Sequence, residues 1–221
     1  LSAQGTKPVP LSLTLPPYIY AVEGTTTGIF YDNLVLSQSP EALRFKVESK
    51  VPGEAQARVW HLSPTKADVG ESSLSITVSD GAGKELAKAA STLRVAAASA
   101  GEGKTLKLLV VGDSLTGAGV YPAEIHRLMG LPGNPAVTLL GTSGAARAPA
   151  LHEGYGGWTW NAFLTQVREK PGERYYDRTS PFVFVDGEKT NFDVPRYFSQ
   201  TLGGTRPEFV TFLLGINDCF S

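Results

Sequence analysis

The stretch LKLLVVGDSLT, residues 106–116, decides the fold of the second half of the chain. It joins a solid apolar run to a glycine and a group of polar residues. Strands that are buried on both faces of a parallel sheet have such runs. Val137–Leu140 and Phe209–Leu214 are two more runs, and segments with helical spacing of apolar residues separate the three. Two of these predicted helices are residues 160–167, with Thr159 as the N-cap, and residues 194–202, which follow Asp193. We therefore expect residues 105–221 to form an α/β domain with helices on both faces of a parallel sheet.

The first part of the chain has a different pattern. Between residues 9 and 95, short segments alternate apolar and polar residues, as in Leu43 to Val47, which is typical of half-buried strands. Asp80–Gly83 has the composition of a hairpin turn. We predict an all-β sandwich domain over residues 1–98, followed by a linker of small residues at 96–104.

Polar groups follow each of the three apolar runs. Ser114 comes directly after the first, a loop containing Gly157 follows the second, and Asn217 follows the third. The carboxyl ends of parallel strands lie at one edge of a sheet, where ligands bind, so we expect a shared pocket. A serine there is suited to attack an acyl carbon, and a glycine N–H with an asparagine amide can donate to the resulting oxyanion.

These residues resemble the sequence blocks of the SGNH (GDSL-type) hydrolases. Residues 112–115 (GDSL) are similar to the first block, 156–159 (GGWT) to the second and 215–218 (GIND) to the third. The resemblance implies a flavodoxin-like three-layer α/β/α domain. It further implies Ser114 as the nucleophile, with Ser114 N–H, Gly157 N–H and the Asn217 side chain holding the oxyanion. Separately, residues 67–70 (ADVG) resemble a corner of immunoglobulin-like and cadherin-like sandwiches.

One part of the SGNH pattern is missing. The family takes its catalytic histidine, and an aspartate three residues before it, from a last block, whereas this sequence ends four residues after Asn217. We expect residues 105–221 to be the N-terminal part of an SGNH domain, inactive alone. His126 is expected on a helix surface, His152 in a loop-ordering hydrogen bond and His61 on a sandwich strand, so none is expected to replace the missing base.

Two further residues are predicted to contact the substrate. Trp158 lies beside the oxyanion glycine and outside the apolar stripe that follows it, so a sugar-stacking or acyl-pocket role and a packing role both remain open. Asp113 precedes the nucleophile, although a local hydrogen bond that shapes the loop is the stronger alternative. Trp160 belongs to the stripe and is expected in the core.

Composition excludes several classes of function. Lysine and arginine number 20 and aspartate and glutamate 21, giving a net charge of -1, with no basic surplus for nucleic acid. No apolar run is long enough to span a bilayer. The histidines and the single Cys219 are scattered, so we predict no metal and no cofactor. The small-residue start at Leu1 resembles a trimmed end, from which we expect a secreted or periplasmic protein.

The sequence therefore predicts ester hydrolysis through an acyl-serine, with O-acyl, above all O-acetyl, esters as substrates. A small molecule or a carbohydrate is the expected ester. The alternative is a carbohydrate-binding or adhesion protein in which the SGNH scaffold is degenerate. A flavodoxin-like phosphate or nucleotide binder using residues 112–119 is the weakest hypothesis, because neither a Gly-X-Gly-X-X-Gly nor a Walker pattern is present. The oligomeric state is not predicted.

Overall fold

The computed structural model describes residues 11–144, 150–168 and 178–220. The chain forms two compact units, residues 1–100 and 101–221. The division between them lies inside the segment of small residues at 96–104. Each unit has its own core and is described by itself.

The first unit is built from two β-sheets. The larger sheet has the order β1-β7-β6-β3 and the smaller the order β2-β5-β4. Neighbouring strands are antiparallel except for β1, which pairs with β7 in parallel. The strands are β1 (Tyr18–Val22), β2 (Thr27–Phe30), β3 (Arg44–Ser49), β4 (Gly53–Ala55), β5 (Val59–Leu62), β6 (Gly70–Ser79) and β7 (Glu85–Ala96). Three short helical turns, Tyr31–Asn33, Pro40–Ala42 and Lys66–Asp68, lie between them.

The core of this unit joins the inner faces of both sheets. Leu74 and Ile76 of β6 are fully buried, and they share one apolar cluster with Trp60 and Leu62 of β5. The residues that alternate with them on β6, Ser73, Ser75 and Thr77, are polar and face away from the core. Alternation along the strand therefore separates a core face from an outer face. The first unit is an antiparallel, sandwich-like region, as the sequence predicts.

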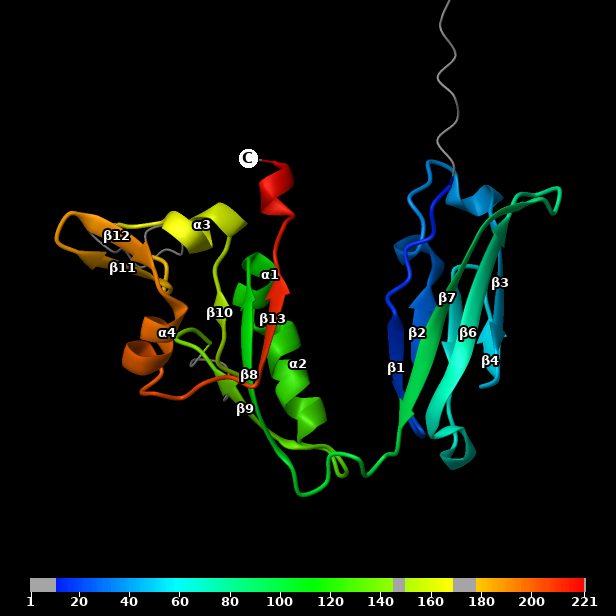
Figure 1. Cartoon of the computed structure of the whole chain (residues 1–221), viewed down its shortest axis with the longest axis horizontal. Coiled ribbons are helices and arrows are strands. Elements are labelled where there is room, and N and C mark those ends of the chain that lie inside the picture. The colour runs from blue at the N-terminus through cyan, green and yellow to red at the C-terminus, as the bar shows by residue number, and fades with distance from the viewer. Residues whose placement is uncertain (1–10, 145–149, 169–177, 221) are drawn as a thin grey trace, which may run out of the picture. The chain divides into compact units, whose positions relative to one another are not determined.

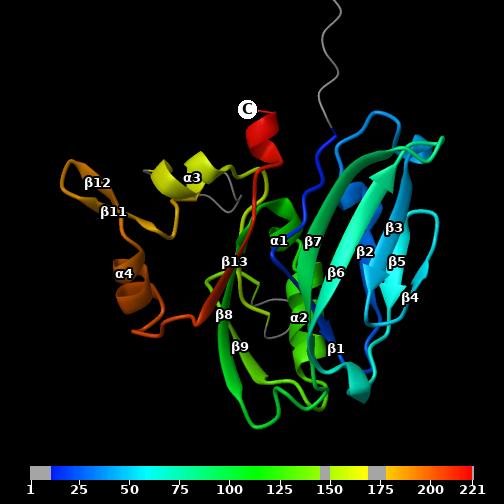
Figure 2. The same cartoon turned by 45° about the vertical axis from the view of Figure 1, so that its right-hand side comes forward.

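The two longest strands, β6 and β7, form the predicted hairpin (Figure 2). The Asp80 carboxylate accepts hydrogen bonds from the backbone N–H groups of Ala82 and Lys84, both at 2.9 Å. Gly83 has a φ of 86°, a left-handed conformation that favours glycine. The side chain of Asp80 thus shapes the turn that the sequence indicates.

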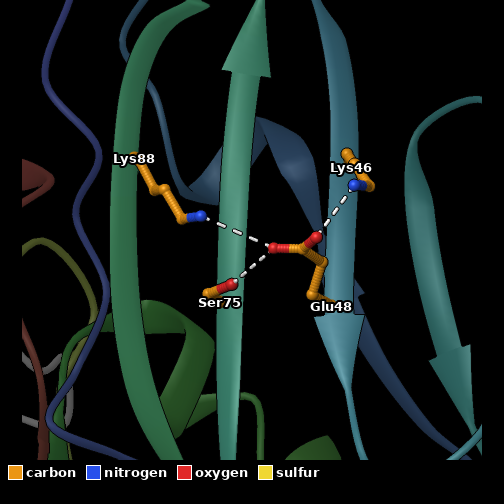
Figure 3. A network of polar contacts seen from close by, with 4 residues as sticks. All are labelled: Lys46, Glu48, Ser75 and Lys88. Atoms are coloured by element: carbon orange, nitrogen blue, oxygen red, sulfur yellow. Dashed lines mark hydrogen bonds and ion pairs between the residues drawn. The ribbon is translucent and has the colours of Figure 1, made fainter.

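The outer face of the larger sheet carries a network of charges (Figure 3). Glu48 accepts from Lys46 at 2.8 Å and from Ser75 at 3.2 Å, and Lys88 lies 3.5 Å from the same carboxylate. The hydrogen bond from Lys46 is the main cause of a lowered Glu48 pKa, and the charge of Lys88 adds to it. All these groups face solvent, so the network contributes little to stability.

The second unit contains a small parallel sheet with helices (Figure 1). β8 (Thr105–Gly112) is its central strand; β9 (Ala136–Leu140) and then β10 (Glu153–Gly154) pair with it on one side, and β13 (Phe209–Leu213) on the other. The helices are α1 (Ser114–Gly117), α2 (Val120–Met129), α3 (Trp160–Thr165) and α4 (Val194–Arg196), which continues into a π-helical turn at Tyr197–Thr201. Asn217–Cys219 form a last short turn. No helix in the described ranges is both long and apolar enough to cross a membrane.

Helix boundaries in this unit follow local signals. Thr159 Oγ1 accepts from the N–H of Ala162 at 3.1 Å, so Thr159 is the N-cap that the sequence predicts for α3. Asp193 likewise accepts from Arg196 N–H at 2.9 Å and caps α4. Gly130 ends α2. These side chains and this glycine set the helix ends without help from distant residues.

Two features of this unit differ from the prediction. Sequence analysis predicted no hairpin, but β11 (Val183–Asp186) and β12 (Lys189–Phe192) form one around Gly187, whose φ is 64°. β13 was expected to be buried on both faces, yet all five of its residues are exposed. β13 pairs only with β8 among the described strands, so the second edge of β13 is open in this part of the chain.

Candidate active site

The three sequence blocks follow strands that end at the same level of the sheet. Gly112, at the end of β8, is aligned with Gly154 of β10 on one side and with Leu213 of β13 on the other. All these strands are parallel, so the segments that follow them leave from one edge. Ser114 follows Gly112 by two residues, and Asn217 follows Leu213 by four. The segments that carry the predicted blocks therefore all start at one edge of the sheet.

The first block turns from β8 into helix α1. Ser114 is the first residue of α1 and is exposed. Asp113 is the N-cap, and its carboxylate, only 1% exposed, accepts from Leu115 N–H at 3.0 Å. The predicted substrate contact of Asp113 is therefore corrected to a structural role, because its carboxylate is buried and caps the helix.

Close packing at two glycines brings α1 against β10, and β8 against β13. A Cβ on Gly154 would lie 2.5 Å from Gly117 N and 2.7 Å from the carbonyl carbon of Thr116. A Cβ on Gly112 would lie 2.8 Å from the carbonyl oxygen of Leu213. The lack of a side chain at 112 and 154 thus lets α1, β10 and β13 approach one another at the candidate site.

The third block is bonded directly to the second. The Asn217 side-chain amide donates to the carbonyl oxygen of Trp158 at 2.9 Å. Asp218 accepts from Trp160 N–H, with its two carboxylate oxygens at 3.1 and 3.3 Å. An asparagine amide has two N–H groups, so Asn217 keeps one donor beyond this bond. The bond also holds the Asn217 amide beside the residue that follows Gly157.

Gly157 is exposed and has a left-handed backbone with a φ of 77°. A Cβ at this position would meet no atom within 4 Å. The glycine is therefore required by the backbone conformation and not by crowding. Of the three predicted site residues, Asn217 is bonded to the residue next to Gly157. Ser114 starts the helix α1, whose residues Thr116 and Gly117 pack against Gly154.

A buried carboxyl group, Glu153, lies below the second block. Glu153 is fully buried and accepts from Thr142 N–H at 2.8 Å, Thr142 Oγ1 at 2.9 Å, Tyr197 OH at 2.5 Å and Tyr155 OH. Burial raises its pKa above 4.5, against the effect of these four donors. Sequence analysis missed this residue; the available signal was a carboxylate directly before the glycine-rich loop.

Glu153 is expected to make stability depend on pH. A folded-state pKa above the unfolded value of 4.5 means that the stability it contributes is complete below pH 4.5 and is lost as pH rises through the raised pKa. We expect the Tm of the second unit to fall as the pH rises from 4.5 to the raised pKa of Glu153. Glu153→Gln, which cannot ionise, should flatten the fall, as measured by thermal unfolding from pH 4 to 8. Glu124→Gln, at an exposed carboxylate on α2, is the control; equal slopes in wild type and Glu153→Gln would contradict the expectation.

His152 has the loop-ordering role that the sequence predicts. It is 2% exposed, and its Nδ1 accepts from Gly154 N–H at 3.0 Å. Burial lowers its pKa, which favours the neutral ring. His126 lies in the last turn of α2 and His61 on β5. In the described ranges, no histidine forms a hydrogen bond with the Ser114 side chain.

Trp158 of the second block and the nearby Trp160 lie in different environments: Trp158 has the packing role that was left open, whereas Trp160 is not in the core as predicted. Trp158 is 2% exposed and packs against Tyr155 and Phe163, with ring centroids at 4.4 and 4.8 Å. Trp160 is 44% exposed and lies against Phe212 of β13 at 5.3 Å. Trp158 is thus a core residue and not a substrate wall. The helical stripe misled the prediction because α3 places Phe163, and not Trp160, towards the core.

Acidic, histidine and cysteine side chains do not gather into a group of three or more that could hold a metal ion, as far as residues 11–144, 150–168 and 178–220 are concerned. The predicted residues of the candidate site offer a hydroxyl, backbone N–H groups and one carboxamide. Such groups suit acyl transfer.

Comparison with known proteins found no match to any family model and none among curated proteins. Solved structures match over part of the chain. The endo-fucoidan hydrolase MfFcnA4 from glycoside hydrolase family 107 is 17% identical, with a TM-score of 0.29 over 37% of this chain and 13% of that chain. The SrpA adhesin from Streptococcus sanguinis is 21% identical, with a TM-score of 0.28 over 42% and 58%.

Human mucin-like protocadherin EC1-2 is 16% identical, with a TM-score of 0.30 over 46% of this chain and 52% of that chain. This chain thus covers less than two thirds of each of these three structures. Adhesin and cadherin domains are among these distant matches, and the family scan provides no evidence for the SGNH resemblance.

Proposed function

We propose that this chain carries the nucleophile and oxyanion-binding part of a serine esterase site of the SGNH type, on a flavodoxin-like α/β domain. The observation that supports it is the convergence of three sequence blocks at one sheet edge. Gly112, Gly154 and Leu213 are in register, and Asn217 is bonded to the carbonyl of Trp158.

The proposed reaction is acyl transfer from an ester to serine and then to water. Ser114 Oγ attacks the acyl carbon while a general base removes its proton, and the carbonyl oxygen becomes an oxyanion. Ser114 N–H, Gly157 N–H and the free N–H of the Asn217 amide donate to it. The alcohol leaves with a proton, and water then releases the acid from the acyl-serine. O-acyl, especially O-acetyl, groups on a carbohydrate are the proposed substrates.

Covalent labelling tests this proposal. The longest natural polypeptide that contains this chain is treated with a fluorophosphonate, which bonds an activated serine oxygen to phosphorus and releases fluoride. We expect one adduct, mapped by mass spectrometry to the peptide with Ser114. Ser114→Ala should abolish it and Ser199→Ala, at an exposed serine on another helix, should not. An adduct on any other serine, or none, would reject Ser114 as the nucleophile.

A second candidate is a binding or adhesion protein in which the α/β unit no longer catalyses. It is favoured by one observation: the Ser114 hydroxyl has no histidine partner in the described part of the chain. An in-frame Asp-X-X-His in the adjoining gene sequence would favour the esterase, and its absence would favour the binding protein.

A further inference from the structure

Strand β1 departs from the pattern of the face on which it lies. The outer face of the larger sheet is polar on β6, where Ser73, Ser75 and Thr77 point away from the core. On β1 the outward residues are instead Tyr18, Tyr20 and Val22. Tyr18 is 39% exposed and Tyr20 66%. Tyr20 is largely exposed, so much of its apolar surface is open to a ligand.

The two rings belong to a compact group of four side chains. The ring centroids of Tyr18 and Tyr20 are 6.3 Å apart, and the Arg94 guanidinium lies 3.6 Å over the Tyr18 ring. Arg94 Nε is 2.8 Å from a carboxylate oxygen of Glu71. Tyr20, Arg94 and Glu71 are in register across β1, β7 and β6. We call these four residues the aromatic platform.

We propose that the aromatic platform binds a neutral carbohydrate chain. A sugar ring has a face of C–H groups, which pack on the negative face of an aromatic ring, and a rim of hydroxyls. Tyr20 offers the exposed ring, and Arg94 and Glu71 at its side offer donors and acceptors for the hydroxyls. The charges of Arg94 and Glu71 cancel, so the platform has no surplus to attract an anionic polymer.

The size and surroundings of the platform favour a carbohydrate over a protein partner. A stable protein interface covers about 800 Å² and 20–30 residues on each side, whereas here a few exposed side chains are bordered by serine and threonine. Tyrosine is also well suited to binding, because it offers a large rigid area at a low cost in side-chain entropy.

The inference rests on the proposed function for its link to a carbohydrate ester, and it adds a separate binding site for the carbohydrate chain, which is tested separately. The platform lies in the first unit and the candidate active site in the second. If both the carbohydrate binding and the esterase activity are correct, the first unit holds the protein on a polymer and raises the effective concentration of the polymer's ester groups at the active site. If the esterase fails, carbohydrate binding can still be measured.

Affinity electrophoresis of the full chain is the test. Native gels contain xylan, glucomannan or β-glucan as neutral polymers, and polygalacturonate as the anionic one. We expect at least one neutral polymer to retard the chain. Tyr20→Ala and Tyr20→Thr, the second retaining high strand propensity, should each weaken that binding by about tenfold or more. Arg94→Ala should weaken it as well.

Matched controls use exposed residues of the same unit. Phe30→Ala removes a ring that is 53% exposed on the other sheet, and Lys88→Ala removes a cation from the same strand and face as Arg94. Both should bind like the wild type. No retardation by any neutral polymer, equal binding of the Tyr20 variants, or binding to polygalacturonate alone would overturn the proposal. So would sedimentation showing a dimer that Tyr20→Thr dissociates, since a second copy would then occupy the platform.

Discussion

Replacing Ser114 by alanine is expected to lower kcat/KM for p-nitrophenyl acetate by at least about 10³-fold, since the change removes the attacking oxygen. The assay requires a polypeptide that extends this chain to a downstream Asp-X-X-His segment. KM should change little, because the proposed role of the Ser114 hydroxyl is in the chemical step and not in ground-state binding. Ser114 is exposed, so the fold should tolerate the change. The unfolding transition should also match that of the parent.

Asn217→Ala tests the proposed oxyanion-binding role in the same assay. It removes one of the proposed oxyanion donors, and the loss of such a donor typically lowers kcat by about 10²- to 10³-fold. It also removes the bond to Trp158, so circular dichroism must accompany the kinetics. Ser199→Ala is the matched serine control. Wild-type rates in Ser114→Ala would end the esterase proposal, whatever Asn217→Ala does.

Gly154→Val is expected to prevent the second unit from folding. The new Cβ would lie 2.5 Å from Gly117 N, and backbone atoms at that distance have no flexible end that can move away. Overpacking alone costs about 1–3 kcal/mol, and here the strand that pairs with β8 must also shift. We expect loss of the second-unit transition in denaturant, while the first unit, with its own core around Trp60, unfolds as in the wild type.

Gly157→Ala is the control for that experiment. Its Cβ would meet nothing within 4 Å, and only the left-handed φ of 77° opposes it. The cost should be about 1 kcal/mol. Near-ultraviolet circular dichroism from the buried Trp158 reports on both variants. A folded Gly154→Val with wild-type stability would contradict the close packing of α1 on β10.

Local signals in the sequence predicted much of the fold. Alternation on β6, the Asp80 turn and the Thr159 cap each depend on residues within a few positions, and each was predicted correctly. The β11–β12 hairpin was missed because its strands are short and its turn at Gly187 lies between two predicted helices. The exposed β13 was predicted as buried because an apolar run does not indicate whether a neighbouring element covers it.

By itself, the sequence determined the apolar runs, the turns and the three blocks at Ser114, Gly157 and Asn217, because each depends on neighbours along the chain. Only the tertiary structure decided that Trp158 is core and Trp160 exposed, and that Glu153 is a buried acceptor of four hydrogen bonds. It alone also revealed the aromatic platform. The physical reason is that burial and side-chain partners come from strands far apart in sequence, and the pattern of one segment contains no information on what packs against it.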